Sequence, residues 1–203
     1  MLDGFWTILV EECDDLDGVE WRWQSADAAL AEGEAKRLAK ARFGGDKTGP
    51  NPTDRAKPGT KRSLLTEADG GPIAVVIDGA NVHDCKLLEA TLDAIIVERP
   101  NPQKVEQHLC LDKGYDNPTS RDAVDKHQYI PHIRRIGEEK FDEQQQKCYP
   151  ARRWVVERTL GWLSKCRAIL VRYDKKACNY LGMIKVACAL LWYRRCWRLS
   201  NVS

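Results

Sequence analysis

The chain has 203 residues, of which 43% are hydrophobic and 31% charged, with a formal net charge of +2. This length supports one full-sized core and argues against two independent domains. The longest apolar stretch, VACALLWY at 186–193, is too short to cross a bilayer, which excludes a membrane span.

Eight cysteines are present, but they have no framework spacing and form no CxxC pair. We therefore expect free thiols in a reducing cytoplasm, with no zinc or redox motif.

The chain starts with an apolar and acidic segment, residues 2–16, that we interpret as a short helix. Residues 19–27 (VEWRWQSAD) alternate apolar and polar side chains, which predicts a first strand ending near Asp27. A Gly- and Pro-rich segment follows, with nine basic residues against two acids between Lys36 and Arg62. We interpret residues 34–62 as a basic loop insertion.

The second half of the chain alternates strands and helices. The sequence RSLLTEADGGPIAVVIDGAN predicts a hairpin of two strands, and HDCKLLEATLDAIIVER has the periodicity of a helix. A buried strand then ends at Asp112 in HLCLDKGYD, before a short helix (NPTSRDAVDKH) and an edge strand (YIPHIRRI). After a polar segment, two helices close the chain, over 152–167 and 176–197. This order predicts an α/β fold, a mixed five-stranded sheet flanked by helices.

Charge is distributed unevenly along the chain. Residues 1–26 hold seven acids and one arginine, a balance of −6, whereas residues 150–203 hold twelve Lys or Arg against two acids, a balance of +10. Such a basic end is typical of a protein that binds a polyanion. A solvated basic surface that keeps the protein in solution is the alternative explanation.

Three acids stand where mixed sheets collect catalytic groups. Asp27 and Asp112 close predicted strands, and Glu157 is the single acid of the basic helix RWVVERTLGWLSKCR. Strand ends are rigid yet open to solvent, and carboxylate oxygens suit Mg²⁺ or Mn²⁺. Two such ions can stabilise the attacking and leaving oxygens of a phosphoryl transfer. Together these three residues can hold such ions, which makes them candidates for catalytic metal ligands.

Each of these acids also has an ordinary structural explanation. Asp112 fits a turn, Asp27 fits a helix N-cap, and Glu157 fits a surface pair with Arg153. The acids of the hairpin region compete for the same catalytic role: Glu67, Asp69 and Asp78, of which Asp69 best fits the turn itself.

Basic residues near these acids are the candidates for contact with a polyanion. Arg153, Glu157, Gly161 and Lys165 are spaced by four and share a helical stripe. We expect Glu157 to face the metal while Arg153, Arg158 and Lys165 face phosphates. A close approach of DNA or backbone would explain Gly161. Two further DNA contacts are expected at the end of the basic loop: Lys61 and Arg62.

Several blocks, in one order, resemble the DDE transposases of bacterial insertion sequences: ARFGGDKTGPNPTDR, GTKRSLLTEADGGP, DGANVHDCKLLEATLD, HLCLDKGYD and RWVVERTLGWLSKCRAILVRYDKK. The chain is most similar to the group whose enzyme is often split between two reading frames. The resemblance implies a ribonuclease-H-like fold, with the catalytic triad on Asp27, Asp112 and Glu157. It also implies metal-dependent strand cleavage at transposon ends, followed by strand transfer into target DNA.

This sequence departs from the family pattern at three places. Relatives often have a lysine seven residues after the Glu, where this chain has Ser164 followed by Lys165. Only 26 residues precede Asp27, so the chain resembles a second-frame product or a truncated copy. The segment after that aspartate, AALAEGEAKRLAKARF, is longer than the usual family link. We divide the chain into residues 1–18, the remnant of an N-terminal region, and a catalytic domain, 19–203, with C-terminal helices at 151–198.

The expected partners are transposon and target DNA, a second copy on that DNA, and a DNA-recognition segment from the upstream frame, with no membrane partner. The expected location is the bacterial cytoplasm, at the nucleoid. For His83 and Asp84, another family block, a helix cap is the preferred explanation, with support of the site as the alternative. A catalytically inactive DNA-binding remnant is the second hypothesis. A carboxylate-pair glycosidase is the third, which the basic helices disfavour.

Overall fold

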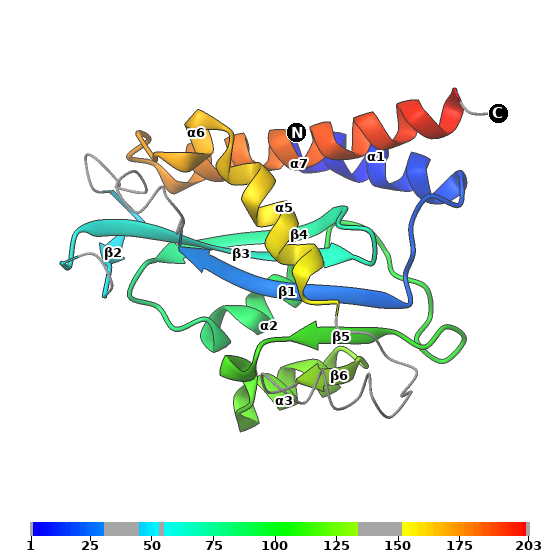
Figure 1. The fold of residues 1–203 in the computed structure, drawn as a ribbon, viewed down its shortest axis with the longest axis horizontal. Helices are drawn as coiled ribbons and strands as arrows, with labels where there is room; N and C mark the ends of the chain where they lie inside the picture. The colour runs from blue at the N-terminus through cyan, green and yellow to red at the C-terminus, as the bar shows by residue number, and fades with distance from the viewer. Residues whose placement is uncertain (1, 31–44, 53–54, 134–151, 202–203) are drawn as a thin grey trace.

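The structure is a computed structural model that describes residues 2–30, 45–52, 55–133 and 152–201 (Figure 1). In chain order its elements are α1 (Leu2–Asp15), β1 (Trp23–Leu30), β2 (Gly49–Pro50), β3 (Pro58–Glu67), β4 (Pro72–Gly79), α2 (Cys85–Asp93), β5 (His108–Leu111), the 3-10 helix η1 (Lys113–Tyr115), α3 (Pro118–Lys126), β6 (Ile130–Ile133), α5 (Trp154–Ser164), α6 (Arg167–Leu170) and α7 (Ala177–Ser200).

Five strands form a mixed sheet in the order β4-β3-β1-β5-β6, and the two-residue β2 pairs with the start of β3. Strand β3 is antiparallel to both β4 and β1, whereas β1, β5 and β6 are mutually parallel. An antiparallel meander followed by strands that alternate with helices is the ribonuclease-H-like arrangement. The predicted fold class is therefore confirmed.

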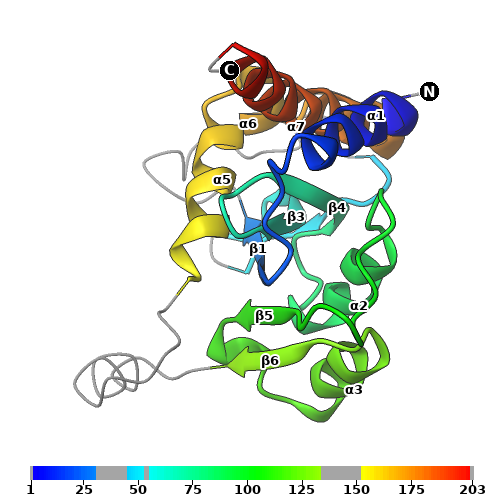
Figure 2. The same ribbon diagram turned by 90° about the vertical axis from the view of Figure 1, so that its right-hand side faces the viewer.

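Helices cover both faces of this sheet. Figure 2 shows α5 on one side, α2 and α3 on the other, and α1 with α7 across the end formed by β3 and β4. Side chains of β3 point alternately to the two faces, as the strand period of two requires. The Arg62 guanidinium reaches Ser164 of α5, whereas the Ser63 hydroxyl accepts a hydrogen bond from Thr91 of α2.

Helix α1 belongs to the same core as the sheet. Its residues Trp6, Val10 and Cys13 are fully buried. The indole N–H groups of Trp6 and of Trp192 in α7 both donate to the carbonyl of Pro72, at 3.2 and 2.6 Å, which fixes the two helices to the start of β4. That residues 1–18 derive from a separate N-terminal region stays a prediction.

The structure corrects three predicted boundaries. Strand β1 runs from Trp23 to Leu30, so Asp27 lies within the strand and not at its end. Strand β3 begins at Pro58, so the last residues of the predicted basic loop are strand. The helix predicted over 152–167 is α5, which ends at Ser164, and a separate short helix, α6, begins at Arg167.

Two predicted loops lie partly or wholly outside the described residues. In the predicted loop 34–62, positions 34–44 and 53–54 lie outside the described residues. The polar segment 138–150, which precedes α5, lies outside them entirely.

Candidate functional site

Asp27 lies on β1 with its side chain on the sheet face that α5 covers. It pairs in register with Leu64 of β3, whose side chain is on the same face as that of Arg62. Ser25, two residues earlier on this face, donates its hydroxyl to the carbonyl of Arg152, immediately before α5. The Ala28 N–H donates to Asp27 Oδ1 at 2.8 Å. Strand pairing therefore directs this carboxylate toward the start of α5.

Asp112 directly follows the buried strand β5, as the sequence predicts. It takes the N-cap position of η1, where its Oδ1 accepts the Lys113 N–H at 2.7 Å. Its side chain is half exposed, at 50%. Strand β5 is parallel to β1 and hydrogen-bonded to it, so Asp112 leaves the sheet on the neighbouring strand to Asp27.

Glu157 lies in the first turn of α5, beside Arg153, which joins it to Asp112. Arg153 Nη1 donates to Asp112 Oδ1 at 2.5 Å, and Arg153 Nη2 lies 3.5 Å from Glu157 Oε1. A carboxylate in the first helical turn also interacts favourably with the helix dipole. One guanidinium thus contacts a strand-end aspartate and a helix glutamate that are far apart in the sequence.

Electrostatics tie Asp27 to the same cluster. Burial raises the pKa of Asp27 from 3.8 to about 6, the Ala28 hydrogen bond opposes the rise, and the negative charges of Glu157, Asp84 and Asp112 add to it. A half-buried carboxyl close to other carboxylates favours either a proton or a nearby cation. The structure therefore brings all three predicted acids into one electrostatic environment.

Two further groups join this environment. Asp84 takes the N-cap position of α2, but its side chain makes no capping hydrogen bond and instead pairs with Lys61 at 2.5 Å. The preferred helix-cap explanation for Asp84 is therefore wrong. Tyr115 of η1 has a buried hydroxyl with no hydrogen-bond partner among the described residues. Burial, and the charges of Asp27, Asp84 and Asp112, raise the pKa of Tyr115.

The sequence did not indicate Tyr115 as a site residue, because an aromatic residue after a Gly turn is typical of the hydrophobic core. Asp84 gave a stronger signal, since it lies in a block that resembles the family.

The donor set fits a hard divalent cation in its chemistry, because it consists of carboxylates beside an unpaired hydroxyl. Within the described ranges, however, no three His, Cys, Asp or Glu side chains are arranged so that they could hold a metal ion as they stand. The Arg153 guanidinium supplies the positive charge that Asp112 and Glu157 contact. A cation bound by these two acids therefore competes with the Arg153 contacts.

Two predicted DNA contacts are contradicted by burial. Lys61 and Arg62 lie on β3 and expose only 7% and 1% of their surface. The Lys61 ammonium bonds to Asp84 and to the Val82 carbonyl, and burial lowers the pKa of Arg62. Both lie in a strand that β1 and β4 flank, so neither faces phosphates.

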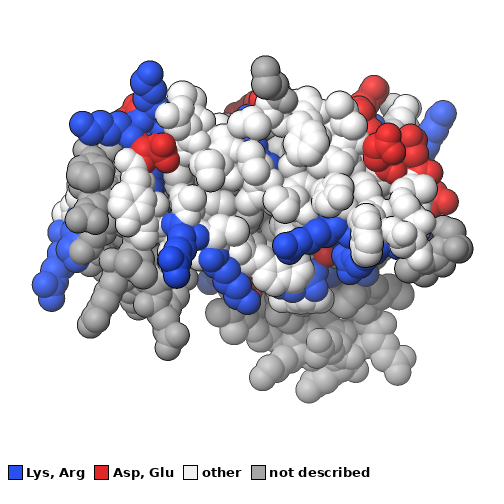
Figure 3. Space-filling view, turned by 90° about the horizontal axis from the view of Figure 1, so that it is seen from above, with Lys and Arg blue, Asp and Glu red and all other residues white. Residues whose placement is uncertain are grey.

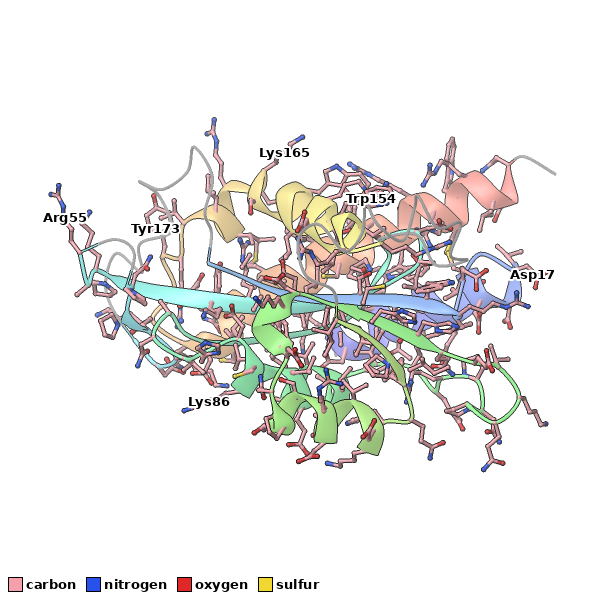
Figure 4. The ribbon with its side chains drawn as sticks, turned by 60° about the horizontal axis from the view of Figure 1, so that its bottom comes forward. Asp17, Arg55, Lys86, Trp154, Lys165 and Tyr173 are labelled. Carbon is pink, nitrogen blue, oxygen red and sulfur yellow. The ribbon has the colours of Figure 1, made fainter. Side chains whose placement is uncertain are left out.

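The basic side chains at α5 differ in how much they contact the rest of the protein. Figure 4 shows Trp154 and Lys165 near opposite ends of α5, with Lys165 pointing away from the sheet. Arg158 donates to the Asp69 carbonyl, and its guanidinium lies over the rings of Trp154 and Trp162, at 4.7 and 5.1 Å. Gly161 is open, since nothing lies within 4 Å of an added Cβ. Lys165 is therefore the more available cation of this helix.

Comparison with known proteins supplies a family. The family model described as the transposase DDE domain matches residues 12–192. The putative transposase for insertion sequence element IS402 of Burkholderia cepacia is 36% identical over 159 residues, which cover 77% of this chain and 71% of that protein. No described helix is long and apolar enough to span a membrane.

Two solved structures of Mos1 mariner transposase are more distant. The paired end complex with Mn gives a TM-score of 0.35 at 12% identity, covering 98% of this chain and 62% of that one. The catalytic domain gives 0.34 at 10% identity, covering 98% and 91%. The family match spans nearly all of this chain, and the IS402 relative covers more than two thirds of it. The chain therefore belongs to the DDE transposase domain family.

Proposed function

We propose that this chain is the catalytic part of an insertion-sequence transposase, which cleaves DNA strands at transposon ends and transfers them to target DNA. Asp27, Asp112 and Glu157 are the proposed catalytic residues and the ligands of Mg²⁺ or Mn²⁺, as two ions. The observation that carries the proposal is the contact of Arg153 with both Asp112 and Glu157, beside a half-buried Asp27 whose pKa both acids raise.

Bound divalent ions supply Lewis-acid polarisation of the phosphodiester and an activated nucleophile. The residues of the chain provide the frame for that chemistry. Strands β1 and β5 hold Asp27 and Asp112 rigidly, and α5 brings Glu157 over them. Arg153, once released by the carboxylates, and the exposed Lys165 are placed to contact phosphates next to the site. The buried Tyr115 hydroxyl, which has no hydrogen-bond partner among the described residues, leaves one donor free for a ligand of the site.

The proposal includes partners and a place of action. Transposon ends and target DNA are the substrates, and joining two ends calls for at least a homodimer on the DNA. A DNA-recognition segment encoded upstream is a further proposed partner. The proposed place of action is the bacterial cytoplasm, at the nucleoid.

A plasmid assay tests the activity. Purified protein with Mn²⁺ is expected to nick supercoiled plasmid, and Glu157→Gln is expected to lower the rate by about 100-fold or more, as loss of a transition-state charge interaction does. A gel shift with the same plasmid controls for DNA binding, which Glu157→Gln leaves intact. Nicking that survives in the variant contradicts the assignment.

A catalytically inactive DNA-binding protein is the second candidate. It is favoured by one observation, the Arg153 guanidinium that already neutralises two of the acids. The same assay separates the candidates, because DNA shifts without nicking by the wild-type chain support binding alone.

A further inference from the structure

Helix α7 carries an exposed apolar stripe over residues 183–197. Met183, Val186, Leu190, Tyr193 and Trp197 are spaced by three and four residues, the a/d spacing of a helix that pairs with another helix. Each is between 37% and 60% exposed. The opposite side of α7 is already buried on the domain core, through Ile184, Cys188 and Trp192. The stripe therefore faces away from the core.

Helix α1 extends this surface sideways. It packs along α7, where the Cys13 thiol bonds to the Trp192 carbonyl and Lys185 pairs with Asp3. Phe5 and Ile8 of α1 are 53% and 56% exposed. Figure 3 views this side of the molecule and shows an uncharged area in its middle, with Lys and Arg side chains along one edge and most acidic side chains at one end. An apolar face of this extent marks an interaction site.

Opposite charges stand at the two ends of the stripe. The C-terminal end of α7 lies beside the end of α1, since Arg195 donates to the Gly18 carbonyl. At this end five exposed acids outnumber two exposed arginines. The acids are Glu11, Glu12, Asp14, Asp15 and Asp17, and the arginines are Arg194 and Arg198. At the N-terminal end of α7, three exposed basic residues outnumber two acids: Arg167, Lys175 and Lys176 against Asp174 and Asp46, which accepts the Ala177 N–H.

We propose that this face, defined by the α7 stripe with Phe5 and Ile8, binds the same face of a second copy of this chain, with the two α7 helices antiparallel. Met183 and Trp197 each lie seven residues from Leu190, so a two-fold axis at Leu190 sets Met183 against Trp197 of the other copy and brings Val186 within one residue of Tyr193. Antiparallel packing also places the acidic end of each copy on the basic end of the other. Parallel packing places like charges together, which disfavours it.

This interface deepens the homodimer of the proposed function, but it is argued from the exposed residues of α7 and α1 and does not depend on the catalytic residues. It is tested by the mass of the chain in solution, without DNA or metal, using sedimentation velocity across the micromolar range. The wild-type chain is expected to be dimeric. Leu190→Glu puts two carboxylates at the dyad and is expected to raise the dissociation constant roughly 100-fold.

Ile130→Glu is the matched control. It adds the same charge at another exposed apolar side chain, on β6, and is expected to leave the dimer unchanged. Circular dichroism of each variant checks that the fold is kept. A monomeric wild-type chain overturns the proposal and leaves the face to a different partner, and a dimer that Leu190→Glu does not weaken overturns it as well.

A charge exchange tests the antiparallel arrangement. The pair Glu12→Lys with Asp15→Lys, and separately the pair Lys175→Glu with Lys176→Glu, are each expected to weaken the dimer roughly tenfold, because each puts like charges together. All four changes in one chain restore opposite charges across the dyad and are expected to restore the affinity. A combined variant weaker than either pair overturns the antiparallel arrangement.

Discussion

Arg153, the N-cap residue of α5, donates to Asp112 at the end of β5, with Nη1 and Oδ1 2.5 Å apart. Its second nitrogen, Nη2, lies 3.5 Å from Glu157. The guanidinium therefore supplies a positive charge between two of the proposed metal ligands, as a bound metal ion would. Any divalent ion that binds both acids competes with this side chain.

Replacing Arg153 is therefore expected to strengthen metal binding. Arg153→Gln removes the positive charge that Asp112 and Glu157 contact, and we expect Mn²⁺ affinity without DNA to rise by roughly 3- to 10-fold, as loss of one partly exposed competing charge implies. Electron paramagnetic resonance of free Mn²⁺ measures this. Arg121→Gln, which breaks the surface pair of Arg121 with Asp116, is the control and is expected to change nothing. Equal or weaker Mn²⁺ binding by Arg153→Gln contradicts competition.

Asp27 is expected to lower the stability of the metal-free fold. Its carboxyl keeps its proton up to about pH 6 in the folded protein, against 3.8 as its ordinary value. The folded state thus binds more protons between these pH values, so stability falls as pH rises through that window and stays lower above it. Asp27→Asn removes the ionised form and is expected to stabilise the protein by about 1–3 kcal/mol near pH 7.

Urea unfolding in a chelating buffer measures the effect of Asp27→Asn. The gain is expected to shrink near pH 4, where most of the wild-type penalty is absent. A variant less stable than wild type near pH 7 would show that the carboxylate is satisfied by groups other than a cation.

The two buried arginines are expected to respond in opposite ways to loss of charge. Arg172 makes five hydrogen bonds, to the carbonyls of residues 46, 47, 174 and 175 and to the Thr60 hydroxyl. Arg62 bonds to Ser164, while its Nε and Nη1 have no hydrogen-bond partner among the described residues. Arg172→Met is expected to cost about 3–5 kcal/mol, whereas Arg62→Met is expected to stabilise the fold by about 1 kcal/mol.

Thermal and urea unfolding of these two variants provide a matched comparison, since both replace a buried arginine by the same residue. Similar losses for both would mean that Arg62 has partners as good as those of Arg172.

Lys165 is expected to contact DNA and Arg62 is not. Lys165→Ala is expected to reduce the slope of log affinity against log salt by about one, the value for one lost phosphate contact. Arg62→Met leaves the slope unchanged, because its side chain is buried. Fluorescence anisotropy with a duplex at several salt concentrations gives both slopes. A reduced slope for Arg62→Met would place that residue on the DNA after all.

The sequence predicted the order of strands and helices because each apolar period is local. Asp112 was readable, since the apolar run of β5 stops at it. The end of β1 was misjudged, because Ala28 and Ala29 fit a helix as well as a strand and only the pairing with β3 decides. Arg62 was predicted to lie in the basic loop and contact DNA, because its hydrogen-bond partner, Ser164, is 102 residues away in the sequence. The link from Arg153 to Asp112 was equally invisible, since it needs the sheet to bring α5 to β5.

The central claim is that Asp27, Asp112 and Glu157 hold the divalent ions that cut DNA. A change of metal preference tests it most directly. Asp112→Cys replaces a hard oxygen ligand by a thiolate, which binds Mg²⁺ poorly but accepts softer ions such as Cd²⁺. The matched control is Asp116→Cys, an exposed aspartate that pairs with Arg121.

The plasmid-nicking rate with each ion gives the result. We expect Asp112→Cys to lose nicking with Mg²⁺ and to regain at least part of it with Mn²⁺ or Cd²⁺, while Asp116→Cys behaves as wild type with every ion. Nicking by Asp112→Cys that proceeds equally well with Mg²⁺ would contradict the claim.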